Sequence, residues 1–145
     1  MADTLEQRNV LIVEDEPIIR STLAEFLTGE KFDVTKAGSV AEALAAAKQR
    51  DFHVAICDVQ LPDGDGVALL RKLQRINPSV FVLIITAYAT VENAVEAFKA
   101  GAFDYLVKPV ILDDVLNKLN RVFRQPSPDQ RISQDTMERQ IAMQR

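Results

Sequence analysis

Disulfides, long apolar runs and an excess of positive charge are all absent from this sequence of 145 residues. Its single cysteine rules out an internal disulfide framework and is compatible with a reducing compartment. No apolar run approaches the ~18 residues that a membrane-spanning helix needs, and residues 1–9 are too polar for a signal peptide. The formal net charge of −4 argues against nucleic-acid binding, because phosphate backbones attract basic surfaces. The sequence therefore predicts a cytoplasmic protein that contacts neither a membrane nor a nucleic acid directly.

What is present is a regular alternation of short apolar runs with longer segments of helical periodicity. Hydrophobic residues make up 48% of the chain and charged residues 26%, which is ordinary for a globular domain. The apolar runs have the length of strands, and their lack of polar alternation is typical of parallel strands that are covered on both faces. These runs are Val10–Val13, Phe32–Ala37, Phe52–Cys57, Val80–Ile85 and Tyr105–Val107.

Five helical patterns lie between and after these runs. Pro17 suits the first turn of the first helix, and Ser39 with Glu42 predicts a capping box at the second. Thr90 is placed to open the fourth helix, and Gly101 to end it. The apolar residues expected to face the core are Ile18, Ile19, Leu23, Phe26 and Leu27, then Val40, Ala43, Leu44 and Ala47, then Val67, Leu70, Leu73 and Ile76, then Val91, Ala94, Val95 and Phe98, and finally Val115, Leu116, Leu119, Val122 and Phe123.

This alternation predicts an α/β fold of the (βα)5 type, a flavodoxin-like doubly wound sheet of five parallel strands with helices on both faces. The expected strand order is 2-1-3-4-5, and ligands of such sheets bind beyond the carboxyl ends of the strands, between the first and third. Residues 1–125 are expected to form this domain. Because "QPSPDQ" has two prolines and no core residues, we interpret residues 126–145 as a linker and the start of an amphipathic helix.

Three acidic residues follow the two strands that flank this expected binding position. Glu14 and Asp15 come after the first strand, and Asp58 comes after the third. Carboxylates held close together are unfavourable unless a cation neutralises them, and Mg²⁺ prefers such oxygen ligands. The alternative is that Glu14 and Asp15 only place negative charge at the start of the following helix. The convergence of three acids favours a metal site.

The fourth and fifth strands end in a hydroxyl and an amine, those of Thr86 and Lys108. Together with the acids, these groups fit phosphoryl transfer, with Asp58 as the nucleophile that forms an aspartyl phosphate. Taken singly, Thr86 has a structural alternative, and Lys108 is equally explained as a solvated charge or as the partner of an acid. The bond between Lys108 and Pro109 is expected to be trans, since only about 5–6% of such bonds in folded proteins are cis.

The stretches "LIVEDEP", "ICDVQLPDGDG", "LIITAYA" and "GAFDYLVKP" together resemble the receiver domain of two-component response regulators, over residues 8–124. The segment "TAYATVENAVEAFKAGAFDYLVKP" is most similar to receivers of the nitrogen-regulation type, which are attached to sigma-54-dependent activators. The resemblance implies that a histidine kinase supplies the phosphoryl group. It also implies that the effector, a transcription regulator by expectation, follows residue 145.

By this resemblance, Asp58 is the phosphoacceptor. Asp15 would bind Mg²⁺ directly, Glu14 would act through a water molecule, and the backbone carbonyl of Gln60 would be a further ligand. Aspartate is commoner than glutamate at the position of Glu14, so its extra methylene is a mild departure from the family. His53 begins a strand at the opposite end and is not expected to take part in the chemistry.

The resemblance further implies that Thr86 and Tyr105 form the switch pair and that Lys108 contacts the phosphoryl group. Phosphorylation would draw Thr86 inward, and Tyr105 would move from a mostly exposed to an inward rotamer. The surface that changes is expected to be residues 90–124, the fourth helix, fifth strand and fifth helix. This face would mediate a phosphorylation-dependent homodimer.

Two other functions compete with this interpretation. A phosphohydrolase with an aspartyl-phosphate intermediate would carry a second acid two residues after its nucleophile, where this chain has Gln60. A flavodoxin-like module that binds FMN would need a phosphate loop after the first strand, where this chain has "EDEP". We therefore expect no enzyme beyond a domain that catalyses its own phosphorylation and dephosphorylation. Asp63 and Asp65 are expected to serve turn formation and helix capping, and the buried Cys57 to be unreactive.

Overall fold

The computed structural model describes residues 8–124. Within this range, five parallel strands form one sheet in the order β2-β1-β3-β6-β7, as expected from the sequence. The strands are β1 (Asn9–Val13), β2 (Asp33–Ala37), β3 (Val54–Asp58), β6 (Phe81–Thr86) and β7 (Asp104–Val107). Their register pairs Val13 with Ala37 and Cys57, so the ends of the central strands are level.

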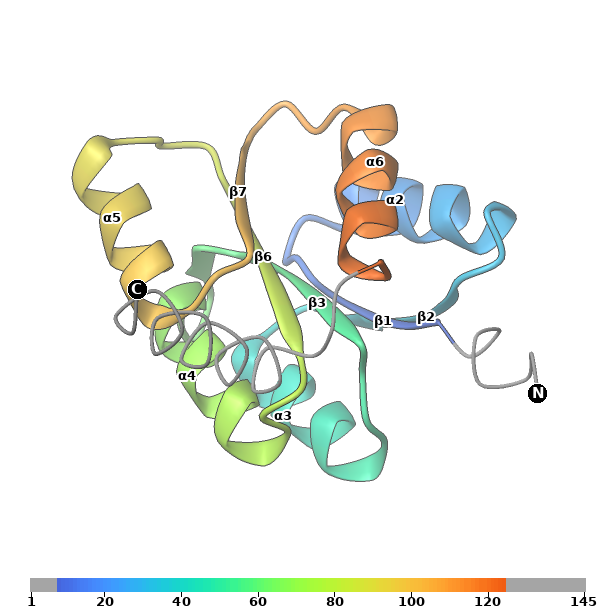
Figure 1. Cartoon of the computed structure of the whole chain (residues 1–145), viewed down its shortest axis with the longest axis horizontal. Helices are drawn as coiled ribbons and strands as arrows, with labels where there is room; N and C mark the ends of the chain where they lie inside the picture. Colours follow the sequence, from blue (N-terminus) through green and yellow to red (C-terminus); the bar gives the residue numbers. More distant parts are fainter. Residues whose placement is uncertain (1–7, 125–145) are drawn as a thin grey trace, which may run out of the picture.

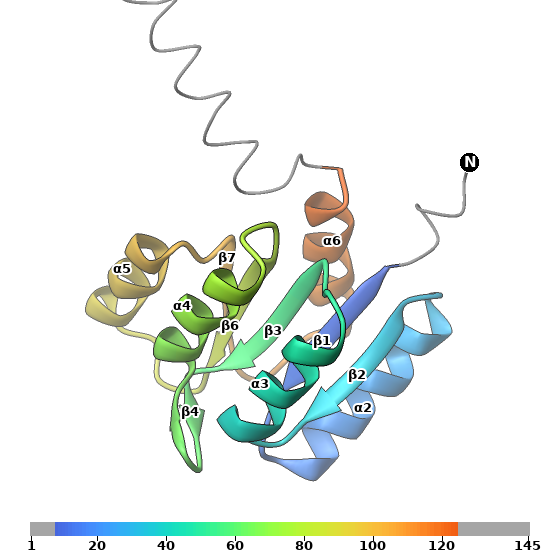
Figure 2. The ribbon, with the colours of Figure 1, turned by 90° about the horizontal axis from the view of Figure 1, so that it is seen from below.

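Helices cover both faces of the sheet (Figures 1 and 2). One face carries α2 (Pro17–Gly29) and α6 (Leu112–Val122), and the other carries α3 (Val40–Gln49), α4 (Gly66–Ile76) and α5 (Val91–Ala100). Successive residues of each strand point to opposite faces. Leu11 accordingly packs with the core under α3 and α4, while Ile12 packs with the core under α2 and α6. The α/β fold class is confirmed.

The predicted caps are present. The Ser39 hydroxyl accepts the Glu42 N–H at 3.1 Å, and the Thr90 hydroxyl accepts the Asn93 N–H at 3.0 Å. The Glu42 side chain accepts the N–H of Gly38 at 3.0 Å, one residue earlier than a standard capping box requires. Gly101 ends α5 with a φ of 110°, a left-handed conformation that glycine adopts without strain.

Some apolar residues do not face the core as expected. Ile18 is 82% exposed, and on α5 the side chains of Val91, Val95 and Phe98 are 77%, 45% and 49% exposed. Ala97 is the buried residue of α5, so this helix contacts the sheet through a small side chain and turns its larger ones outward. The expected trans bond before Pro109 is also wrong, since the Lys108–Pro109 bond is cis.

A small antiparallel hairpin follows β3, which the sequence indicated only as a turn. It consists of β4 (Gln60–Leu61) and β5 (Gly64–Asp65), joined through Pro62 and Asp63. The Asp65 side chain then caps α4 by accepting the Val67 N–H at 3.0 Å. The expected linker and helix at 126–145 lie outside the described residues. No helix within residues 8–124 is long and apolar enough to cross a membrane.

Candidate functional site

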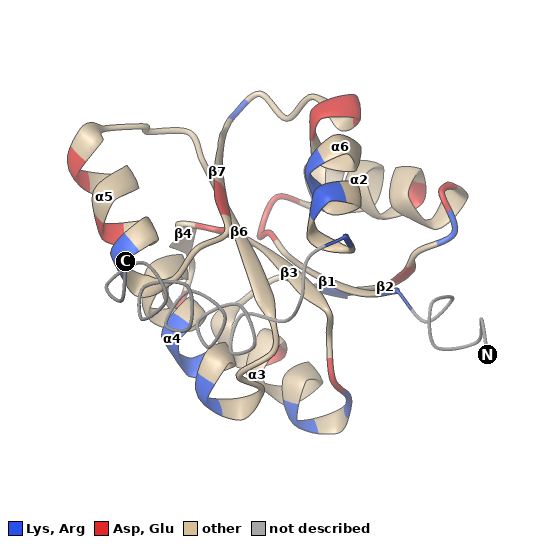
Figure 3. Ribbon diagram, viewed as in Figure 1, with Lys and Arg blue, Asp and Glu red and all other residues tan. Residues whose placement is uncertain are grey.

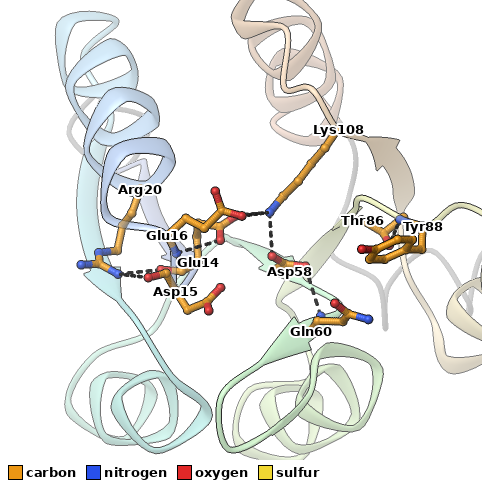
Figure 4. Close-up of polar contacts among 9 residues, drawn as sticks. All are labelled: Glu14, Asp15, Glu16, Arg20, Asp58, Gln60, Thr86, Tyr88 and Lys108. Atoms are coloured by element: carbon orange, nitrogen blue, oxygen red, sulfur yellow. Dashed lines mark hydrogen bonds and ion pairs between the residues drawn. The ribbon is translucent and has the colours of Figure 1, made fainter.

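The carboxyl ends of β1, β3, β6 and β7 bring the predicted site residues to one edge of the sheet (Figure 4). Asp58 is the last residue of β3 and is only 5% exposed. Its Oδ1 accepts the Gln60 N–H at 3.1 Å, and its Oδ2 lies 2.8 Å from Lys108 Nζ. A buried strand thus delivers a carboxylate that is held at both oxygens by fixed donors.

Glu14 directly follows β1 and is fully buried. Its Oε2 accepts the Glu16 N–H at 3.0 Å, and its Oε1 lies 2.8 Å from Lys108 Nζ. Burial raises the pKa of Glu14, and the nearby charge of Asp58 adds to this rise, while the hydrogen bonds from Lys108 and Glu16 oppose it. The charged form of Glu14 is therefore held in the site at a cost.

Lys108 connects the two buried acids. Its Nζ lies 2.8 Å from both Glu14 Oε1 and Asp58 Oδ2, and 3.6 Å from Glu16 Oε1. Burial lowers the pKa of Lys108, but the hydrogen bonds and charges of Asp58 and Glu14 outweigh it, so the pKa is raised overall. The ammonium group is consequently charged at any physiological pH and is the cation nearest to Asp58 in Figure 4.

Three carboxylates form a cluster that fits a divalent cation. One oxygen each from Glu14, Asp15 and Asp58 lie within 4.8 Å of one another. Glu14 Oε1 is buried, and Lys108 Nζ lies 2.8 Å from it. Asp15 is exposed and lines the same cleft as Asp58 and Gln60. Mg²⁺ and Ca²⁺ take carboxylate oxygens of this kind as ligands. Because the cleft is open, water molecules can complete the coordination of the ion.

Thr86 ends β6 and is 2% exposed. Its hydroxyl accepts the N–H of Tyr88 at 3.0 Å, and its carbonyl accepts the N–H of Lys108 at 2.8 Å. These bonds tie the ends of β6 and β7 together. The Thr86 hydroxyl is thereby placed beside the loop that leads to α5.

Tyr105 lies on β7, where its ring is partly buried and its hydroxyl oxygen is buried, and its expected move from an exposed to an inward rotamer stays a prediction. The ring packs against that of Phe98, at a centroid distance of 6.4 Å, and against the core beneath α5. Burial raises the pKa of Tyr105, and the nearby Thr86 hydroxyl offsets part of that rise. The tyrosine hydroxyl has no partner of hydrogen-bond geometry among the described residues.

Sequence patterns did not identify every residue that shapes the site. Arg20 donates to the carbonyl oxygen of Glu14 at 2.8 Å and to that of Asp15 at 3.4 Å (Figure 4). Tyr88 lines the cleft opposite the acids. Arg20 acts on backbone carbonyls, which any residue supplies, so no residue pattern marks it. The expectation for Cys57 agrees with its environment, since burial and the charge of Asp58 raise the pKa of its thiol to about 12.

The charges are unevenly distributed around the sheet. The β1–α2 loop with Glu14, Asp15 and Glu16 is acidic, whereas lysines and arginines gather along α4 and at the end of α3 (Figure 3). The single histidine, His53, stands at the start of β3, at the opposite end of the strand from Asp58. Acidic side chains therefore line the cleft, and the basic side chains of α3 and α4 lie away from it.

Comparison with known proteins gives one consistent likeness. The family model of the response regulator receiver domain matches residues 10–120. The transcriptional regulatory protein ZraR of Escherichia coli O157:H7 is 38% identical over 118 residues, which are 81% of this chain and 27% of that protein. The aligned part thus spans about a quarter of this curated relative.

Solved structures share the fold closely. The beryllofluoride-activated NtrC4 receiver domain dimer is 34% identical, with a TM-score of 0.78, and the match covers 81% of this chain and 98% of that one. A response regulator from Burkholderia pseudomallei, solved with a phosphorylated aspartic acid, a calcium ion and citrate, is 29% identical, with a TM-score of 0.75 and coverage of 91% and 75%.

Proposed function

Because this chain belongs to the response regulator receiver domain family and is most like receivers of the NtrC type, we propose that it is a phosphorylation-activated switch whose phosphoacceptor is Asp58. The observation that carries the proposal is the placement of Lys108, whose Nζ lies 2.8 Å from the carboxylates of both Asp58 and Glu14. A buried carboxylate with a fixed cation on one side and, on the other, an acidic cluster that can hold a divalent cation is arranged for a reaction that brings in further negative charge.

The reaction begins with attack of an Asp58 carboxylate oxygen on the phosphorus of the donor. The new P–O bond forms as the bond from phosphorus to the leaving group breaks, and the leaving group departs with the bonding electrons. Lys108, already charged, neutralises an oxygen of the transferred group, and Thr86 donates its hydroxyl hydrogen to another. The domain is therefore a catalyst of its own phosphorylation and dephosphorylation only, and not an enzyme that acts on other substrates.

Mg²⁺ is the cofactor that this site supports best. Asp15 and Asp58 would hold it directly, Glu14 through water, and the Gln60 backbone carbonyl from the start of the hairpin. When bound, the ion neutralises the phosphoryl oxygens and the clustered carboxylates. The calcium ion named with the phosphorylated Burkholderia regulator supports a divalent cation in receivers of this kind.

The partners follow from the same proposal. A histidine kinase supplies the phosphoryl group in the cytoplasm, and the domain controls an effector. That effector regulates transcription, by analogy with ZraR, and sigma-54-dependent activation is the subclass that the NtrC4 likeness favours. The signal leaves through α5, β7 and α6. The dimer named for the activated NtrC4 receiver domain supports a homodimer, and we propose this face for it.

The assignment of Asp58 is tested by intact mass spectrometry. The full chain is incubated with acetyl phosphate, with and without Mg²⁺, and should gain the mass of one phosphoryl group only when Mg²⁺ is present. Asp58→Asn keeps the shape of the side chain and removes the nucleophilic oxygen, so it should show no gain. Equal labelling of wild type and Asp58→Asn would disprove the assignment, and Asp51→Asn, distant on the chain's exposed surface, is the matched control that should label normally.

A further inference from the structure

The turn between β2 and α3, residues 38–42, is braced by its own hydrogen bonds. The Ser39 hydroxyl accepts the Glu42 N–H, and the Glu42 carboxylate accepts the Gly38 N–H at 3.0 Å. These two bonds cross the turn in opposite directions. These bonds brace the start of α3.

The β1–α2 loop is fastened beside this turn by Arg20. The Arg20 guanidinium donates to the carbonyl oxygens of Glu14 and Asp15, as Figure 4 shows. On its other side it lies against Gly38, where an added β-carbon would come within 2.9 Å of Arg20 Nη1. The absence of a side chain at Gly38 thus leaves the space in which the guanidinium reaches the acidic loop.

The hairpin after Asp58 is fastened to the same turn by Asp63. Its carboxylate accepts the N–H of Val40 at 2.7 Å and the N–H of Ala41 at 3.0 Å. The first N–H groups of a helix such as α3 have no acceptor within the helix itself. Backbone also comes close here, since a β-carbon on Gly64 would lie 3.1 Å from the Val40 side chain. The hairpin that begins with Gln60 is therefore held against α3 by polar and van der Waals contacts.

We propose that Arg20 and Asp63 are positioning residues for the metal. Arg20 braces the loop of Glu14 and Asp15 through its carbonyls, in the space beside Gly38, and Asp63 fastens the loop of Asp58 and Gln60 to the same turn. This inference rests on the Mg²⁺ site of the proposed function. Neither residue reaches the metal. Each fixes the separation of the loops that carry its ligands.

Metal selectivity distinguishes positioning from a general contribution to folding. Mg²⁺ demands near-ideal octahedral geometry at about 2.0–2.1 Å, whereas Ca²⁺ accepts 6–8 ligands at about 2.3–2.6 Å in flexible arrangements. Loops that are no longer held in place should therefore lose affinity for Mg²⁺ before they lose affinity for Ca²⁺. A variant that only lowers stability, while remaining folded, changes the two affinities alike.

The experiment titrates the full chain with MgCl2 and with CaCl2, followed by the amide NMR signals around Asp58. Arg20→Ala and Asp63→Ala should each raise the Kd for Mg²⁺ on the order of tenfold, as outer-shell substitutions commonly do, and should raise the Kd for Ca²⁺ clearly less. Arg71→Ala is the matched control, since Arg71 is exposed on α4, and it should leave both values unchanged.

Milder substitutions keep the test decisive if an alanine variant fails to fold, as judged by circular dichroism. Asp63→Asn retains one acceptor oxygen and Arg20→Lys retains one charge, so each should show a smaller shift in the same direction. Unchanged affinities, or equal losses for both ions, would overturn the positioning role while leaving the proposed site intact. A wild-type chain that binds neither ion near Asp58 would overturn the proposed site and the positioning role together.

Discussion

At the scale of single residues, the site holds charged side chains at buried positions, which stability of the fold alone would not favour. Glu14 is fully buried, with Asp58 close to it, and burial is the main cause of its raised pKa. A raised carboxyl pKa means that the folded state binds this proton more tightly than the unfolded state does. The contribution of Glu14 to stability therefore grows as the pH falls through the raised pKa, and at neutral pH its ionisation is a cost.

Glu14→Gln should consequently stabilise the chain at pH 7 when no metal is present. The amide keeps the shape of the side chain and removes the buried negative charge, and gains of about 0.5–2 kcal/mol are usual when such functional strain is removed. Urea unfolding without Mg²⁺ measures the difference. A lower midpoint for Glu14→Gln would instead show that the ion pair of Glu14 with Lys108 stabilises the fold more than burial of the acid costs.

Lys108 behaves in the opposite sense. Its raised pKa means that its interactions stabilise the fold fully below the unfolded pKa, about 10.4, and that this stability is lost only as the pH rises through the higher folded value. Lys108 therefore contributes no pH dependence of stability in the physiological range.

Site residues that stand at the ends of strands could be predicted from the sequence. Site residues whose side chains bond to backbone groups could not. Asp58, Thr86 and Lys108 follow buried runs, so the topology alone brings them together. Arg20 and Asp63 bond to carbonyl and N–H groups, which every residue has, so their partners leave no mark in a single sequence. The convergence of the strand ends indicated a metal site with Asp58 as the nucleophile, and the family resemblance added the separate ligand roles of Asp15, Glu14 and Gln60.

At the scale of elements, the connection from β3 to α4 is the tightest in the site. Gly66 donates its N–H to the carbonyl of Val59 at 2.7 Å, which closes the hairpin back onto the end of β3. A β-carbon added at Gly66 would overlap the carbonyl oxygen of Asp58. The backbone of the phosphoacceptor and the first residue of α4 thus share a space that only glycine leaves open.

Gly66→Ala should therefore destabilise the chain by about 1–3 kcal/mol, the usual cost of forcing an extra carbon into a packed site. It should also shift the amide signals of Asp58 and Val59, because the backbone there has to move. Gly29→Ala is the matched control, since no atom lies within 4 Å of a β-carbon at Gly29, and its effect should stay within about 0.5 kcal/mol. Equal unfolding midpoints for the two variants would contradict the predicted overlap.

Strands and helices could be predicted from the sequence where a continuous run of their residues is buried, and less well elsewhere. The hairpin of Gln60–Leu61 and Gly64–Asp65 is too short for any apolar pattern, so it was indicated only as a turn. The prediction that Val91, Val95 and Phe98 of α5 face the core was wrong. These residues repeat at helical spacing whether they pack in a core or stay exposed. Periodicity identifies an apolar face and does not say what covers it.

At the scale of the whole molecule, the exposed apolar side chains of α5 and β7 form the surface that the proposed signal changes. Val91, Val95 and Phe98 are exposed on α5, which contacts β7, and Val107 on β7 is 51% exposed. Tyr105 packs on Phe98 from below, so any movement of its ring is felt directly by this face. Its buried hydroxyl has no partner of hydrogen-bond geometry among residues 8–124, so this side chain is the one whose contacts we expect to change when Thr86 moves.

The size of the response limits what Thr86 can do alone. Reversing a population from 1:99 to 99:1 requires about 5.5 kcal/mol of differential affinity. One hydrogen bond to a charged group contributes about 1.5–3 kcal/mol. The Lys108 contact and the reordering of the loop before α5 must therefore supply the remainder, and loss of Thr86 should weaken the switch without abolishing phosphorylation.

We therefore predict that the phosphorylated chain forms a homodimer through the α5–β7–α6 face and that Thr86→Ala, although still phosphorylated on Asp58, associates more weakly. Val95→Glu places a charge on the exposed face of α5 and should leave the phosphorylated chain monomeric. Ile18→Glu is the matched control, because Ile18 is 82% exposed on α2, across the sheet from α5. Sedimentation after acetyl phosphate treatment, with the phosphorylated fraction checked by intact mass, measures all four proteins. Association of Val95→Glu equal to wild type would place any dimer on another face, and association of Thr86→Ala equal to wild type would remove Thr86 from the path by which the phosphoryl group is sensed.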